Sequence, residues 1–312
     1  MCVRILGLGS DHVNFLEMLE DAQLFFKEIE TCGFSLEQPS ISFLKGLKNF
    51  QKTGSYIENL SFPINQIEFN TLSKSENFEI TKEIIHELYD GLYDNKMDSL
   101  LSLMKLDSNS ERFDGGVAGD YDTKTQTKIY DEGFIYSFTE SYVPVILSHE
   151  FTHTFYGNHF SPGQNYNYNE FCSIFADFFA ANYMCFKQED HLNKYQFIRF
   201  NHLKECFQEF NNLYEHSQEF LKPNDQLSLH LLPYRYSYYY HYGYIVSIVY
   251  STLLFQEYLD SPKEVLKEFR KVVTHEQKVE ELLNKYQISF RNSERTRQFQ
   301  KILQNVHDKK QI

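Results

Sequence analysis

The stretch from residue 147 to residue 155, LSHEFTHTF, constrains this chain more than any other part of its sequence. Residues four positions apart on a helix lie one turn apart on the same face, so His149 and His153 can direct both imidazoles at one metal ion. Glu150 lies beside them, offset from that ion, where it can hold a water molecule that the ion activates. This His-Glu-x-x-His spacing predicts a helix that carries a catalytic zinc site.

The residues around this motif favour a helix from about 142 to 157. Pro144 falls in its first turn, where the missing N–H costs nothing, and Gly157 is a suitable end. An apolar stripe that can bury the helix consists of Val143, Ile146, Leu147 and Phe151. The alternative is a surface helix with two incidental histidines, which this context disfavours.

A catalytic zinc site needs a third protein ligand and an open fourth position for water. Glu170, at the start of a second predicted helix from about 168 to 187, is one candidate. His159 is the other, because it follows His153 by the six residues used in metzincins, whose motif has a glycine three residues after the second histidine. Tyr156 occupies that glycine position, and a bulky residue is unfavourable in such a turn. Glu170 is therefore the preferred ligand, and His159 remains the alternative.

Asp177 lies seven residues after Glu170, on the same face of the second predicted helix. From there it could accept a hydrogen bond from a ligand imidazole or support Glu170. The alternative is a solvated carboxylate, because helical spacing alone does not set the depth of a side chain.

Three glycines occur close together upstream of the zinc motif, in the segment 113–121. Glycine lets a bound ligand lie close to the main chain, so the predicted substrate contacts are Gly116, Val117, Ala118 and Gly119. Residues 125–130 then alternate enough to form a strand, with 134–138 as a possible partner. A strand at this place can serve as the edge to which an extended peptide adds by main-chain hydrogen bonds.

Tyrosines are concentrated in a late segment, 234–244. Phenol and imidazole groups can donate hydrogen bonds to the oxyanion that forms when water attacks a peptide carbonyl. The candidate donors are Tyr240, His241 and Tyr244. The alternative is that these rings are core aromatics whose hydroxyl groups are satisfied within the protein.

Three of these stretches together resemble the catalytic region of oligoendopeptidase F and its thimet oligopeptidase relatives, which are zinc metallopeptidases of the gluzincin type. Residues 115–122, the predicted strand and residues 148–153 are similar to the family's glycine-containing segment, strand and His-Glu-x-Gly-His helix, with Thr152 in place of the glycine. Residues 170–177 are similar to Glu-Thr-Ala-Ser-Thr-Phe-Ala-Glu, whose first glutamate is the third zinc ligand. The tyrosine-rich segment is similar to the one that supplies transition-state donors in that family.

The resemblance implies a mainly α fold, a gluzincin-type helical metallopeptidase catalytic domain with a small β-sheet beside the zinc helix. Residues 107–312 are expected to form this domain, and residues 1–106 a helical region that packs on it. One zinc ion would be held by His149, His153 and Glu170, and the enzyme would hydrolyse extended peptides with Glu150 as general base. The chain is about half the length usual for the family, so a restriction to short peptides is not carried over.

Two other functions stay open at this point. A catalytically weak peptide-binding or regulatory protein would keep the zinc helix without useful turnover. A metzincin-like protease would instead use His159 as its third ligand.

Composition and charge disfavour several other classes of protein. The 312 residues are 42% hydrophobic and 17% aromatic, which is typical of a globular chain, and the net charge of −13 disfavours a nucleic-acid partner. The five cysteines are scattered without a Cys-x-x-Cys pair, which fits reduced thiols in a cytosol. The apolar runs are too short for a signal peptide or a membrane span. We therefore expect a soluble, cytoplasmic protein with no membrane or nucleic-acid partner. The expected partner is the peptide substrate, and the sequence leaves its identity and the oligomeric state of the protein open.

Overall fold

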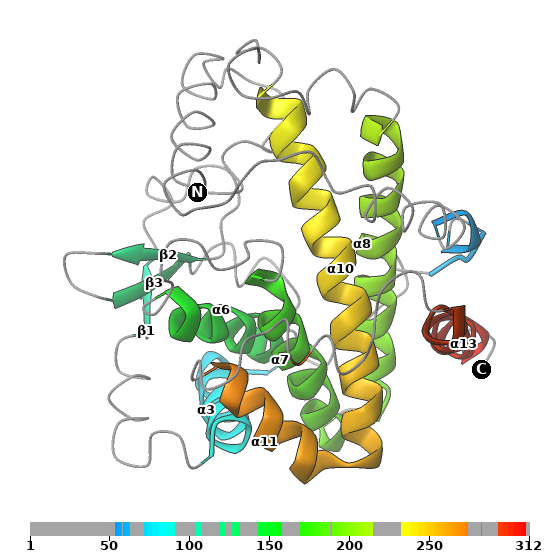
Figure 1. The fold of residues 1–312 in the computed structure, drawn as a ribbon. Coiled ribbons are helices and arrows are strands. Elements are labelled where there is room, and N and C mark those ends of the chain that lie inside the picture. Colours follow the sequence, from blue (N-terminus) through cyan, green and yellow to red (C-terminus); the bar gives the residue numbers. More distant parts are fainter. Residues whose placement is uncertain are drawn as a thin grey trace.

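A computed structural model describes this chain in segments that are mostly helical (Figure 1). The described residues are 54–57, 59–62, 72–90, 104–107, 119–122, 127–131, 143–157, 169–187, 189–214, 232–273, 282 and 293–309. The helices are α3 (Lys74–Leu88), α6 (Val143–Gly157), α7 (Asn169–Tyr183), the 3-10 turn η5 (Met184–Phe186), α8 (His191–Tyr214), α10 (Leu232–Asp260), α11 (Pro262–Val273) and α13 (Ser293–Asp308). Helices α6 and α7 confirm the two predicted around 142–157 and 168–187.

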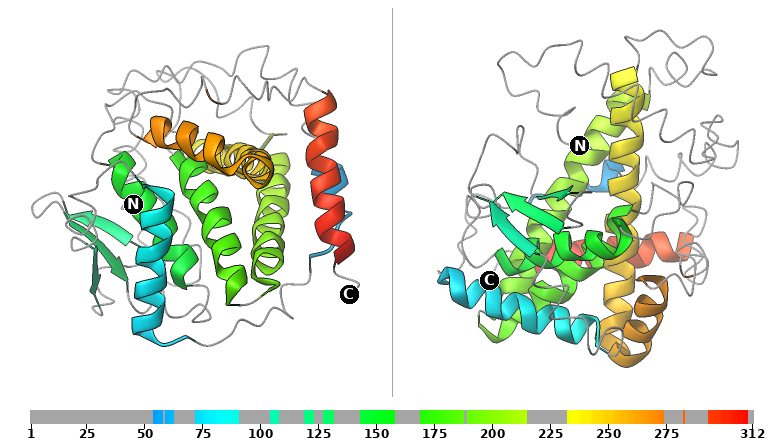
Figure 2. Two further views of the ribbon diagram at one scale, coloured as in Figure 1. Left: turned by 90° about the horizontal axis from the view of Figure 1, so that it is seen from below. Right: turned by 90° about the vertical axis from the view of Figure 1, so that its left-hand side faces the viewer.

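Helix α7 is the element around which the other helices pack. It contacts α6 and α3 as well as α10 and α8, an arrangement that is clearest in the views of Figure 2. Its sequence is apolar almost all round, as expected for a helix that is covered on every side. The phenylalanines that it buries are Phe171, Phe175, Phe178 and Phe179. Because the core holds α7 along its length, the polar side chains that it carries have fixed positions.

Helix α3 packs on α6 and joins it through an uncharged polar contact. The hydroxyl of Tyr89, directly after α3, lies 2.6 Å from Oγ1 of Thr152 on α6. Thr152 in turn donates to the main-chain oxygen of Ser148 at 2.8 Å. The start of α3 is fixed by a capping box, in which the Ser73 side chain and the Glu76 side chain each bond the other residue's backbone N–H. The contact between Tyr89 and Thr152 thus joins the end of α3 to α6 without a charged group.

Three short strands precede α6 in the chain: β1 (Met104–Asp107), β2 (Gly119–Asp122) and β3 (Thr127–Asp131). β3 overlaps the strand predicted at 125–130, whereas the partner predicted at 134–138 lies outside the described residues. The strand order is β1-β3-β2, with β1 parallel and β2 antiparallel to β3. β3 is therefore the middle strand, and the expectation that it offers a free edge to a peptide is wrong.

The structure also corrects the predicted fold class. Most of the described residues lie in helices, and α6 packs chiefly against α7 and α3, with a smaller contact to β2. The described packing is therefore mainly α, and the predicted gluzincin-type catalytic domain is not the architecture that it shows. The physical reason is that helical periodicity and caps are local, whereas the neighbours of a helix are set by contacts between distant segments.

Residues from both sides of the predicted boundary at 106/107 share one core. Ile84 and Leu88 of α3 belong to the same buried cluster as Phe175 of α7 and Phe269 of α11. The division into a region 1–106 and a catalytic domain 107–312 remains a prediction.

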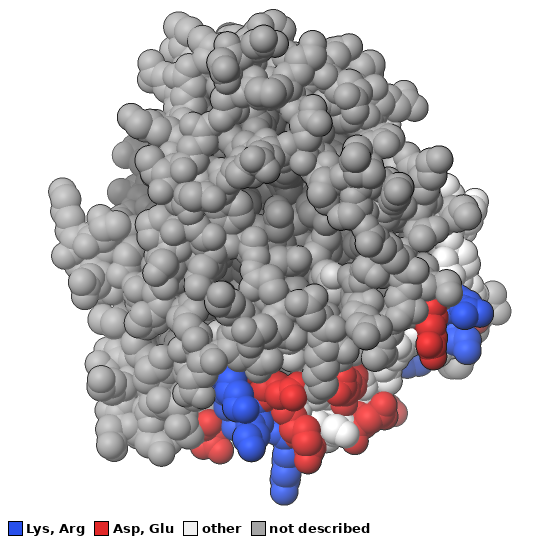
Figure 3. Space-filling model, in the orientation of Figure 1, with Lys and Arg blue, Asp and Glu red and all other residues white. Residues whose placement is uncertain are grey.

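The described surface carries charges of both signs. On the face shown in Figure 3, the described lysines, arginines and carboxylates form two groups, one along the lower edge near α3 and α11 and one at the lower right near α13. Lys82 and Glu79 on α3 form an ion pair with an N–O distance of 2.9 Å. In the part of the chain that the structure describes, no helix combines the length and the apolar character needed to cross a membrane.

Candidate metal centre

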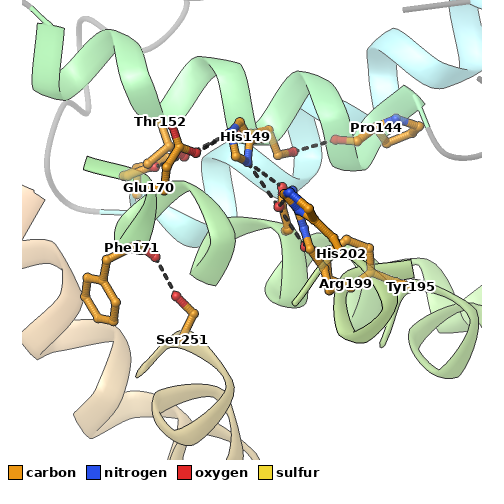
Figure 4. Close-up of polar contacts among 12 residues, drawn as sticks. Pro144, His149, Thr152, Glu170, Phe171, Tyr195, Arg199, His202 and Ser251 are labelled. Atoms are coloured by element: carbon orange, nitrogen blue, oxygen red, sulfur yellow. Dashed lines mark hydrogen bonds and ion pairs between the residues drawn. The ribbon is translucent and has the colours of Figure 1, made fainter. Parts of the chain in front are cut away.

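The facing sides of α6 and α7 bring together two of the three predicted zinc ligands (Figure 4). His149 lies near the middle of α6, and Glu170 lies in the first turn of α7. Nε2 of His149 is 3.3 Å from Oε2 of Glu170. The side chains of His149 and Glu170 are 11% and 22% exposed, so both are largely buried and still touch solvent. Glu170 thus lies beside His149, whereas the alternative ligand His159 lies outside the described residues.

The other ring nitrogen of His149 faces Asp177, two turns further along α7. Nδ1 of His149 lies 3.1 Å from Oδ1 and 3.0 Å from Oδ2 of Asp177. The Asp177 side chain is 1% exposed, so the predicted contact with the imidazole is confirmed and the solvated alternative is wrong. A carboxylate against Nδ1 keeps a proton on that nitrogen, which leaves Nε2 as the atom that can bind a metal.

Helix α8 contributes two residues to this cluster that the sequence did not reveal. The guanidinium of Arg199 donates from Nη2 to Oδ2 of Asp177 and from Nε to the hydroxyl of Tyr195, the latter at 2.6 Å. The same hydroxyl donates to Oδ2 of Asp177 at 2.7 Å. Tyr195 and Arg199 are one helical turn apart on α8. This spacing, which places a phenol and a guanidinium on one face, was the only indication of their contact in the sequence. Asp177 is thus bound by an imidazole, a phenol and a guanidinium.

The charges in this cluster shift the pKa values of its members strongly. Burial alone favours the neutral ring of His149, but the nearby carboxylates of Asp177 and Glu170 outweigh it and raise the pKa of His149 to about 10. Burial likewise opposes ionisation of Asp177, yet His149 and Arg199 together hold its pKa below the usual value. Without a metal, His149 is therefore protonated at pH 7, and its Nε2–H faces the carboxylate of Glu170.

The atoms that face each other here fit a zinc ion. Two ligand atoms that each lie about 2.05 Å from a tetrahedral zinc ion are about 3.3 Å apart. The distance between Nε2 of His149 and Oε2 of Glu170 is 3.3 Å, and the imidazole and carboxylate are both ligands that zinc accepts. A metal ion could thus replace the proton on Nε2 with little movement of either side chain.

The remaining predicted ligands fall outside the side chains that the structure describes. His153 lies within α6, one turn after His149, but only its backbone is described, and His159 is not described at all. Among the described residues, no group of three or more histidines, cysteines and carboxylates forms a metal site. His149 and Glu170 therefore represent the described part of the predicted ligand set. Glu150, the predicted base, follows His149 on α6 and is half-buried.

The tyrosine-rich segment forms the first half of α10 and brings two of its candidates near this cluster. The ring of Tyr244 lies 5.0 Å from the ring of His202 on α8, and Nδ1 of His202 lies 3.5 Å from Nη1 of Arg199. Burial, followed by the charges of Arg199 and His241, lowers the pKa of His202 to about 3. His202 is therefore neutral at pH 7. It is the second described histidine near this cluster, and the sequence analysis did not identify it.

Several other predicted site residues are not described. Tyr240 belongs to α10, but only its backbone is described. Gly116, Val117 and Ala118 precede the first described residue of β2, Gly119, so the predicted substrate contacts stay predictions.

Comparison with known proteins identifies no relative of this chain. No protein-family model matches it, and no match was found among curated proteins or among solved structures.

Proposed function

We propose that this protein is a zinc-dependent peptidase whose metal ion is held by His149, His153 and Glu170. The observation that supports this most is the 3.3 Å separation of His149 Nε2 from Glu170 Oε2, with Asp177 on the opposite ring nitrogen. A carboxylate behind a metal-binding imidazole is the usual way in which proteins orient such a ligand and increase its basicity. Two surface histidines of incidental origin would not need this arrangement.

The residues around the metal divide the chemistry between them. When bound, zinc would supply a Lewis acid that lowers the pKa of a water ligand toward neutrality. Glu150 would take the proton from the attacking water and pass it to the leaving amine. Hydrogen bonds to the developing oxyanion would come from Tyr240, His241 or Tyr244 of α10.

The proposed substrate is a peptide that binds in extended form, and the proposed location is the cytoplasm. Support for the location comes from the cysteines, because Cys172, Cys185 and Cys206 are all free thiols. In an extended peptide, the carbonyl group of the cleaved bond would face the metal, and the leaving amine would lie near Glu150.

The first experiment measures the zinc content of the purified protein and its cleavage of a quenched fluorescent peptide library. We expect about one zinc ion per chain and cleavage that a chelator abolishes and added zinc restores. Zinc without cleavage would favour the peptide-binding alternative. The absence of zinc would contradict the proposal.

A matched pair of variants then tests the third ligand. Glu170→Ala is expected to lose both zinc and cleavage, whereas His159→Ala is expected to keep both. The reverse result would support the metzincin-like alternative, in which His159 binds the metal.

A further inference from the structure

The guanidinium of Arg199 is fixed in a closed set of contacts behind the candidate metal pair. It binds Oδ2 of Asp177 and the hydroxyl of Tyr195, and that hydroxyl also donates to Oδ2 of Asp177 (Figure 4). Arg199 and Tyr195 thus hold the same carboxylate oxygen from two directions. The Asp177 carboxylate cannot rotate without breaking bonds to both.

The direction of this carboxylate sets the direction of His149. Both oxygens of Asp177 lie within 3.1 Å of Nδ1, so the imidazole is aligned by a carboxylate that is itself aligned from behind. The opposite nitrogen, Nε2, then faces Glu170. A chain of contacts therefore runs from α8 through Asp177 to the atom that would bind the metal.

The charge of Arg199 is needed when a metal is bound. A histidine that binds a metal is neutral, so it no longer neutralises the carboxylate behind it. Asp177 is 1% exposed, and a buried carboxylate without a compensating charge strongly destabilises the folded protein. Among the ion pairs that the structure describes for Asp177, only the one with Arg199 would then remain.

We propose that Arg199 is a positioning residue of the metal centre, which holds the Asp177 carboxylate in the orientation in which His149 presents Nε2 to the metal. This inference rests on the proposed zinc site, and it adds a residue from α8 to the two helices that carry the ligands. Arg199 acts through Asp177 and touches neither the metal nor the substrate. The rival explanation is that Arg199 only attaches α8 to α7.

Arg270 provides a matched control for that rival explanation. Its guanidinium also joins two helices, because it donates to the main-chain oxygens of Leu88 at 2.9 Å and Glu87 at 2.7 Å. It connects α11 to the end of α3 and has no contact with Asp177 in the described structure. Arg270→Gln should weaken the attachment of a helix and leave zinc binding unchanged.

The test measures the zinc dissociation constant of the full chain by competition with a chromophoric chelator. Asp177→Asn and Arg199→Gln are each expected to weaken zinc binding by about 10-fold to 100-fold, the range found when partners of metal-binding histidines are removed. The double variant should bind zinc no more weakly than Asp177→Asn alone, because Arg199 without Asp177 contributes only a nearby positive charge. Arg270→Gln should bind zinc like the wild type.

Two results would overturn the inference. The first is a zinc affinity in Arg199→Gln equal to that of the wild type. The second is a double variant in which the two single effects multiply, because Arg199 would then act independently of Asp177. If Arg199→Gln does not fold, Arg199→Lys is measured instead, since lysine keeps the charge but cannot span Asp177 and Tyr195 with one planar group. An affinity reduced by about threefold or more supports the inference, and an unchanged affinity overturns it.

The same measurements separate this inference from the proposed function. A wild-type protein that binds no zinc overturns both. The expected pattern of affinities without any peptide cleavage supports the role of Arg199 and contradicts the peptidase. Peptide cleavage by a zinc-containing wild type, together with an unchanged affinity in Arg199→Gln, contradicts only the role of Arg199.

Discussion

Helix α6 makes two different kinds of contact with its neighbours. Toward α7, His149 is bound at 3.0 Å by the buried carboxylate of Asp177, which is bound in turn by a guanidinium on α8. Toward α3, Thr152 lies 2.6 Å from the hydroxyl of Tyr89, and the ring of Phe151 lies 6.0 Å from the Tyr89 ring. The first contact is charged, and the second is neutral and largely apolar.

The two sides of α6 therefore have different roles: the neutral side stabilises the fold, and the charged side carries the proposed metal ligand. Buried charges lose much of their attraction to desolvation, so a charged cluster is weak evidence for stability. Aromatic packing and a satisfied hydroxyl pair stabilise a fold without such a cost. Changes on the charged side should therefore alter metal binding and rate, and changes on the neutral side should alter the free energy of unfolding.

The largest effect is expected from Glu150→Gln on the charged side. Removal of the general base should lower the rate of peptide cleavage by roughly 10²-fold to 10⁴-fold, while zinc content stays the same because Glu150 is not a ligand. Single-turnover cleavage and metal analysis measure the two quantities. Glu83→Gln is the control, since Glu83 accepts a surface hydrogen bond from Tyr183 and should leave the rate unchanged. Full activity in Glu150→Gln would remove Glu150 from the mechanism.

The opposite pattern is expected from Phe151→Ala on the neutral side. The Phe151 side chain is buried beside Tyr89, and its removal should lower the free energy of unfolding by about 3–5 kcal/mol. Chemical denaturation measures the loss, and the folded protein should keep its zinc affinity. Phe186→Ala is the control, because Phe186 is 58% exposed and should cost less than about 1 kcal/mol. A loss of zinc affinity in folded Phe151→Ala would mean that the two sides of α6 are not independent.

The pH dependence of stability should also distinguish the two sides. Burial, and then the charges of Arg199 and His241, lower the pKa of His202 in the folded protein to about 3; Glu170 has a smaller opposing effect, and His149 lowers the pKa slightly further. The unfolded chain therefore binds a proton more readily, so the stability that His202 contributes is present above about pH 6.5 and is lost as the pH falls toward 3.

The measurement compares the metal-free wild type with His202→Gln by chemical denaturation from pH 7 to pH 5. The wild type should lose up to about 1.4 kcal/mol per pH unit more than His202→Gln below pH 6.5. Tyr89→Phe, a change on the neutral side, should follow the wild-type pH profile. Parallel profiles of the wild type and His202→Gln would show that His202 takes up its proton equally in the folded and unfolded states.

Local sequence patterns predicted the parts of the structure that depend on neighbours in the chain. Helical spacing and a first-turn proline were enough for α6, and the spacing of Glu170 and Asp177 placed both on one face of α7. The contact of Asp177 with His149 followed from that face. These predictions succeeded because each depends on the geometry of a single helix. The contact between His149 and Asp177 needed one further assumption, that α6 and α7 pack against each other.

The parts that sequence reasoning missed depend on contacts between distant segments. The spacing of residues along α8 does not show that Arg199 and His202 approach α7. An amphipathic pattern indicates which face of a helix is buried, but not which helix covers that face. The role of β3 was missed for the same reason, since its parallel partner β1 lies more than twenty residues upstream and carries no strand signal of its own. The predicted fold class was wrong for the same reason. It was inferred from the resemblance of short motifs, which do not specify how distant helices pack.

The smallest effect, and the sharpest test of the neutral side, is expected from Tyr89→Phe. This change removes one hydroxyl group and keeps the ring that packs against Phe151 and Phe269. Thr152 still donates to Ser148, so the change removes the described hydrogen bond between Tyr89 and Thr152, and the free energy of unfolding should fall by about 1 kcal/mol. Tyr183→Phe removes a hydroxyl that bonds Glu83 at the surface, where water replaces it, and should cost less. Zinc affinity should be unchanged in both variants. If Tyr89→Phe instead weakened zinc binding as Asp177→Asn should, the hydroxyl pair would belong to the metal centre, and the division of α6 into a charged and a neutral side would be wrong.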